Sequence, residues 1–179
     1  MILQGVINAL GNEDWESEFD LTPKALPRSF FAVALYIPLS FVAARAAVKY
    51  NDVVGHVPYL SIALILILIS LTFPLVAYIL CSVFDKQESF RAWVIVRHWA
   101  ILFAWIIVAL PFGIYLIGLI PFSVAFFLGM MAYLGTLAID IRLAARVAGF
   151  DWTGAVFAGI LITASSMMVL LLGMQQIIS

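Results

Sequence analysis

The sequence carries little charge, because Asp, Glu, Lys and Arg make up only 11% of its 179 residues. A soluble domain is charged at about a quarter of its positions and apolar at about half. Here 65% of the residues are hydrophobic, which is more than a domain of this size can bury away from water. The composition therefore predicts that most of the chain lies in a lipid bilayer.

The chain also lacks the residues that build several common sites. It has one cysteine, Cys81, which excludes an internal disulfide. Its two histidines, His56 and His98, are predicted near opposite membrane faces, where they cannot share a metal or a haem. The formal net charge of -1 argues against the basic surface of a nucleic-acid-binding protein. We therefore expect no metal site, no cofactor and no nucleic-acid partner.

Five apolar runs are long enough to cross a bilayer. At a rise of 1.5 Å per residue, about 20 residues span the hydrocarbon core of roughly 30 Å. The sequence therefore predicts an all-α, polytopic membrane protein in which residues 27–179 form a bundle of about five transmembrane helices. The predicted spans cover residues 27–48, 58–84, 93–118, 121–141 and 152–178.

Two of these spans have ends that the hydrophobic pattern leaves open. The segment SFRAWVIVRHW, residues 89–99, begins the third span or forms an interfacial helix that delays the crossing to Ala100. The fourth span is expected to continue as a helix into water through DIRLAARVAG, residues 140–149.

Residues 1–26 are predicted to lie outside the bilayer. Apolar residues recur at helical spacing in the first ten positions, and Gly11 offers a stop. This pattern predicts a short amphipathic helix that lies on the membrane or on a partner. An acidic stretch follows, and it is either a solvated tail or a docking element for a basic partner surface. Its carboxylates are Glu13, Asp14, Glu16, Glu18 and Asp20.

The basic residues predict an orientation. Five crossings place successive connections on alternate sides, and Arg45 and Lys49 are the basic residues of one side. Because cytoplasmic connections are enriched in Lys and Arg, we expect the N-terminus in the cytoplasm and the C-terminus on the outer side of the membrane. The basic residues on the predicted cytoplasmic side are Lys24, Arg28, Lys86, Arg91, Arg97, Arg142 and Arg146.

Arg97 and His98 form the most deeply placed ionisable pair. A charge inside a membrane helix suggests function, although Arg97 lies near the end of its span, where it can extend to the headgroups. We therefore predict one of two roles. Either Arg97 simply extends from the end of its span toward water, or Arg97 and His98 contact lipid headgroups or a partner. Proline occurs inside three spans and indicates either cavity-lining broken helices or ordinary kinks; these prolines are Pro38, Pro74 and Pro111.

A stripe of small residues follows one face of the fifth span. It consists of Ala155, Gly159, Thr163 and Ser166. Small residues let helices approach closely. The stripe therefore predicts packing within the bundle or, alternatively, an interface with another subunit.

The sequence does not predict a catalytic site, because no acid, base and nucleophile lie at the same predicted depth in the membrane. The function predicted first is therefore non-enzymatic: an accessory or scaffold subunit of a larger membrane assembly, with membrane lipids and other membrane subunits as partners. The alternative is a small transporter or channel, suggested by the prolines. An intramembrane enzyme ranks last.

Three segments carry a family resemblance. ALGNEDWESEFDLTPKALPRSFFAVALYIP, SFRAWVIVRHW and YLGTLAIDIRLAARVAGFDWTGAVFAGILI occur in this order. They resemble a group of small five-span inner-membrane proteins of alphaproteobacteria with no assigned function, which is distantly similar to the five-helix topology of the Yip-domain family. The group usually has Asn where this chain has His98. The resemblance implies a bacterial inner membrane and brings no catalytic residue with it.

Overall fold

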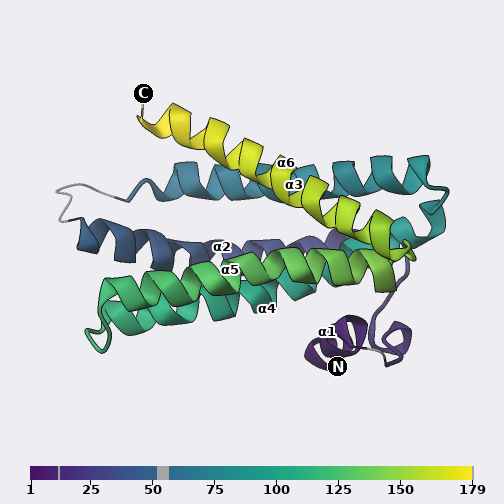
Figure 1. Cartoon of the computed structure of the whole chain (residues 1–179), viewed down its shortest axis with the longest axis horizontal. Helices are drawn as coiled ribbons and strands as arrows, with labels where there is room; N and C mark the ends of the chain where they lie inside the picture. Colours follow the sequence, from purple (N-terminus) through teal and green to yellow (C-terminus); the bar gives the residue numbers. More distant parts are fainter. Residues whose placement is uncertain (12, 52–56, 179) are drawn as a thin grey trace.

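The computed structural model describes residues 1–11, 13–51 and 57–178, with side chains up to residue 173. This part of the chain is helical and contains no strand (Figure 1). Its helices are α1 (Ile2–Leu10), α2 (Ala25–Tyr50), α3 (Tyr59–Val83), α4 (Phe90–Leu116), α5 (Phe122–Arg146) and α6 (Trp152–Ile178). Two short 3₁₀ turns, Glu16–Glu18 and Gln87–Ser89, precede α2 and α4.

The predicted five-helix membrane fold is confirmed. Five of the described helices are long and apolar enough to cross a bilayer, so the chain is an integral membrane protein. The helix α4 runs without a break from Phe90, so SFRAWVIVRHW belongs to the third span and is not a separate interfacial helix. The helix α5 continues to Arg146, as predicted. The crossing segments are Ala25–Tyr50, Tyr59–Val83, Gln87–Leu116, Phe122–Arg146 and Trp152–Gly173.

The five long helices pack unevenly, and α3 is the one that lies most loosely in the bundle. The helix α4 packs along both α2 and α5, and α6 packs along α5 and α3. By contrast, α3 makes few contacts with α2 or α4. Figure 1 shows α3 running roughly parallel to α2, with α6 crossing α3 diagonally. The loose packing of α3 against α2 and α4 leaves room for the cavities described below.

The helices continue through their internal prolines. Pro38, Pro74 and Pro111 lie inside α2, α3 and α4, and each helix extends on both sides of its proline. A proline supplies no N–H to the carbonyl four residues earlier, and for Pro74 that carbonyl belongs to Ser70. The structure therefore shows continuous helices with locally freed carbonyls, not helices broken into halves.

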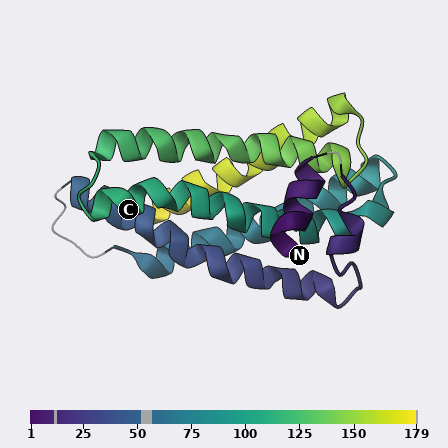
Figure 2. The same cartoon turned by 90° about the horizontal axis from the view of Figure 1, so that it is seen from below.

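The N-terminal helix α1 docks on its own chain. It lies crosswise beside α4 and α5 (Figure 2) and buries Val6 and Ala9 against them. Its last carbonyls lack helical partners, and the guanidinium of Arg142 meets them, with Nε donating to the Leu10 carbonyl at 2.8 Å. Arg146 donates to the Glu13 carbonyl at 3.4 Å.

This docking answers part of what the sequence left open for residues 1–26. The surface that receives α1 is the chain's own bundle, and its basic residues bind main-chain carbonyls of the segment. The opposite face of α1 exposes Ile2, Leu3 and Ile7, which suits contact with lipid at the membrane surface. Two of the acidic side chains, Asp14 and Asp20, accept hydrogen bonds from the nearby backbone of Glu16 and Thr22.

Candidate functional site: a polar cavity inside the bundle

A buried ion pair joins α4 to α5. The Arg97 guanidinium donates from Nε to Asp140 Oδ1 at 2.5 Å and from Nη2 to Oδ2 at 3.0 Å. The side chains are 11% and 3% exposed, and the Phe73 ring of α3 lies 3.9 Å from Arg97 Cζ. This two-pronged arrangement suits the planar fork of arginine and neutralises both charges within the bundle.

The pair corrects two predictions from the sequence. Asp140 was expected in water, and Arg97 was expected at the headgroups or on a partner. Both residues instead lie inside the bundle. At 1.5 Å per residue, Arg97 lies roughly 10 Å from the N-terminal end of α4, and Asp140 lies roughly 10 Å from the C-terminal end of α5. The physical reason is that a charge near a helix end need not extend to water when an opposite charge faces it from the next helix.

His98 also lies inside the bundle. It is 2% exposed, and its Nδ1 lies 2.8 Å from the Ser29 hydroxyl oxygen of α2. The Phe30 ring packs against the imidazole with centroids 4.5 Å apart, and Nε2 has no hydrogen-bond partner among the described residues. These contacts leave His98 no access to lipid headgroups, contrary to that prediction.

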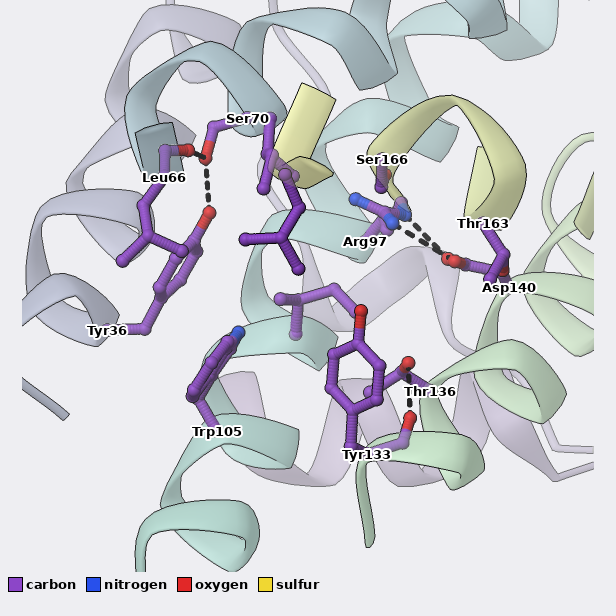
Figure 3. Close-up of a pocket in the computed structure, with 13 residues that line it drawn as sticks. Tyr36, Leu66, Ser70, Arg97, Trp105, Tyr133, Thr136, Asp140, Thr163 and Ser166 are labelled. Carbon is purple, nitrogen blue, oxygen red and sulfur yellow. Dashed lines mark hydrogen bonds and ion pairs between the residues drawn. The ribbon is translucent and has the colours of Figure 1, made fainter. Parts of the chain in front are cut away.

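A polar cavity of about 140 Å³ opens beside the ion pair (Figure 3). All five long helices contribute to its wall. Leu66, Ile101 and Trp105 supply apolar surface. The polar wall residues are Tyr36, Ser70, Arg97, Tyr133, Thr136, Asp140, Thr163 and Ser166. The sequence did not predict this cavity, because the residues come from five separate helices.

Some polar groups of the wall are already satisfied by each other. The Tyr36 and Ser70 hydroxyls form a hydrogen bond. Ser70 also donates to the Leu66 carbonyl at 2.7 Å, and Thr136 donates to the Tyr133 carbonyl at 2.6 Å. These bonds hold the hydroxyls against the helices, as buried polar groups require.

Other donors of the wall have no hydrogen-bond partner among the described residues. Arg97 uses Nε and Nη2 for Asp140, so Nη1 keeps its N–H groups free. In Figure 3 this side chain and the Trp105 indole nitrogen face the cavity, with Thr163 and Ser166 near Arg97. An indole N–H is a donor only. The cavity therefore presents N–H donors together with hydroxyl groups, which can donate or accept.

The small-residue stripe of α6 faces the chain's own bundle. Ala155 is fully buried, and a Cβ added to Gly159 would lie 2.5 Å from Cγ1 of Ile141 on α5. Thr163 and Ser166, farther along the stripe, line the cavity. The stripe thus lets α6 approach α5 at one end and supplies hydroxyls to the cavity at the other.

A second, apolar space adjoins the cavity. This apolar groove has a volume of about 360 Å³ and lies between α2 and α3. Ala44 and Ala47 of α2 and Ile62 of α3 contribute to its wall, and Ser40 and the Trp105 indole supply the polar atoms of the described lining side chains. Leu66, Trp105 and Leu170 line both the groove and the polar cavity.

The residues considered for metal chemistry lie apart from this site. Cys81 is fully buried in the core, and His98 contacts α2. His56 lies outside the described residues. Among the residues that the structure describes, no three His, Cys, Asp or Glu side chains come together in a way that could hold a metal ion.

No family model, curated protein or solved structure matches this chain. The resemblance to five-span inner-membrane proteins therefore remains a prediction from the sequence.

Proposed function

We propose that this chain is a non-enzymatic integral membrane protein that holds a hydrogen-bond-accepting ligand in the cavity beside Arg97. The observation that supports this proposal most directly is the free Nη1 of Arg97, which faces the cavity in Figure 3. An N–H group that faces a cavity inside the bundle is available to donate a hydrogen bond to the molecule that occupies the cavity. A ligand oxygen at this position would satisfy it.

The same geometry argues against catalysis. Both carboxylate oxygens of Asp140 accept hydrogen bonds from Arg97, so Asp140 is poorly placed to act as a base. His98 and Cys81 do not line the cavity. In the described part of the chain, Ser166 and Thr163 therefore have no adjacent base to activate them as nucleophiles.

We propose that such a ligand-binding chain serves as an accessory or scaffold subunit of a larger assembly in a bacterial inner membrane. The outward face of α5 supports this role, because α5 has the smallest buried share of the five spans. Gly135 on that face has open space where a side chain would stand. A helix of another subunit could approach closely there.

A small transporter or channel is the second candidate, and the polar wall of the cavity favours it. Towards the other end of the bundle, however, the adjoining groove is almost wholly apolar. A charged solute would pass that region without partners, at high cost. We therefore rank the accessory role first; solute uptake by vesicles containing the purified chain alone would reverse this order.

Ligand retention at Arg97 is the first prediction. Native mass spectrometry of the chain, gently extracted from its membrane, is expected to show one retained molecule per chain. The double substitution Arg97→Leu with Asp140→Leu removes the donor without leaving an unpaired charge. It should lose the retained molecule, whereas Gly135→Leu should keep it. Equal retention in all three proteins would contradict the proposal.

The orientation is the second prediction. The N-terminal segment and the α3–α4 and α5–α6 connections share one end of the bundle (Figure 1), and we propose that this basic end faces the cytoplasm. A reporter that is active only in the periplasm should therefore be active when fused after residue 179 and inactive when fused before residue 1. The opposite pattern would invert the proposed topology.

A further inference from the structure

The polar cavity and the apolar groove together have the form of a site for one amphipathic molecule. They meet at Leu66, Trp105 and Leu170, which line both spaces. Along α4, Trp105 lies about 12 Å beyond Arg97 at 1.5 Å per residue. Along α2, Ala47 of the groove lies about 16 Å beyond Tyr36 of the cavity. The two spaces therefore follow one another along the bundle axis.

The cavity limits the size of the polar head. Its volume of about 140 Å³ is close to that of an engineered cavity of about 150 Å³ that binds benzene. One six-membered ring with small substituents is therefore the expected scale of the head. A phospholipid headgroup with its glycerol is larger, and its two chains exceed what a single groove accommodates.

The charges and donors of the cavity define the chemistry of the head. Asp140 already neutralises Arg97, so a phosphate or carboxylate would enter without a counter-ion of its own. A neutral head avoids this cost. The unused groups are the Arg97 Nη1 and Trp105 Nε1 donors and the hydroxyls of Thr163 and Ser166. These groups match a head that carries oxygen acceptors.

We infer that the cavity and the groove bind one isoprenoid quinone or a close chemical equivalent. Its ring lies beside Arg97, with a carbonyl oxygen accepting a hydrogen bond from Nη1, and its single apolar chain runs past Trp105 into the groove. The head then lies nearer the basic end of the bundle and the chain extends toward the opposite end. This inference rests on the proposed ligand-binding function and specifies its ligand.

The test uses a para-benzoquinone with a decyl chain as the probe. The full chain is reconstituted in phosphatidylcholine nanodiscs. Quinone binding is followed by quenching of tryptophan fluorescence and by native mass spectrometry, and decylbenzene, which does not quench, is measured by its competition with the quinone. Decylbenzene is the matched ligand, because it keeps the ring and the chain but lacks the acceptor oxygens. We expect saturable binding of one quinone per chain. The affinity for decylbenzene should be lower than that for the quinone by about tenfold or more.

Three variants locate the ring and the chain. Ala47→Phe fills the groove far from Arg97 and should weaken quinone binding about tenfold or more. Trp105→Phe removes one donor but keeps an aromatic ring, and it should weaken binding severalfold. Gly135→Leu, which faces open space on α5, should leave binding unchanged. Thermal unfolding of each variant verifies that the bundle is intact.

The outcomes separate this inference from the proposed function. Equal binding of decylbenzene, or unchanged binding in a folded Ala47→Phe variant, would overturn the quinone assignment. If native mass spectrometry instead finds a phospholipid or a water-soluble molecule that depends on Arg97, the quinone assignment fails and the proposed function stands. If no molecule depends on Arg97, both fail.

Discussion

Replacing Asp140 alone with leucine is expected to destabilise the bundle by about 3–5 kcal/mol, the usual cost of leaving one partner of a buried ion pair without the other. Arg97 would keep its charge, because a guanidinium does not lose its proton in proteins. Its side chain is only 11% exposed, so bulk water would compensate little of that charge. The measurement is the midpoint of thermal unfolding in a mild detergent.

The double variant supplies the control. Arg97→Leu with Asp140→Leu leaves two apolar side chains facing each other across α4 and α5, and exchanges of this kind are often neutral or stabilising. The double variant should therefore recover most of the stability that Asp140→Leu loses. If the single and double variants unfold alike, the two side chains do not interact in the membrane as the structure shows.

This ion pair also marks where inference from the sequence stops. The five spans were predictable because each needs only an apolar run of sufficient length, a property of one segment. The partner of Arg97 depends on which faces of α4 and α5 meet, a property of two segments 43 residues apart. Asp140 therefore looked like the first residue of a helix entering water, although it is almost fully buried.

The N-terminal segment shows the same limit. Spacing alone predicted the helix Ile2–Leu10 and its end at Gly11. Arg142 and Arg146 were counted only as basic residues on one side of the membrane, yet they also bind carbonyls of Leu10 and Glu13. Residues more than 130 positions apart meet here, and no local periodicity records such a contact.

The cavity was missed for a related reason. Thr163 and Ser166 were recognised as part of a small-residue stripe, and Arg97 was recognised as a deep charge. Their convergence requires α6 to cross from α5 to α3, which only the packing of the helices shows. Polar residues at matching depths in several predicted spans are the one signal that could have indicated the site before the structure.

The stripe itself leads to the last prediction. Gly159→Leu should destabilise the isolated chain by about 1–3 kcal/mol, as overpacking does in cores. A Cβ at this position would lie 2.5 Å from Ile141 Cγ1 and 3.2 Å from the Ile141 backbone nitrogen. A side chain can rotate away, but the backbone contact forces α6 and α5 apart. The reduced midpoint of thermal unfolding of the purified chain is the measurement.

Gly135→Leu is the matched substitution on the other side of α5, where no atom lies within 4 Å of the added Cβ. It should leave the stability of the isolated chain within about 0.5 kcal/mol, as for surface substitutions. If a neighbouring subunit covers this face, the leucine should block its approach and release the chain from the assembly during sizing in mild detergent. Gly159→Leu would then affect the stability of the monomer, and Gly135→Leu would affect the assembly.

Two outcomes would contradict these expectations. A Gly159→Leu chain that keeps full stability would show that α6 does not pack against α5 through this stripe. A Gly135→Leu chain that stays in its assembly would place the partner surface elsewhere.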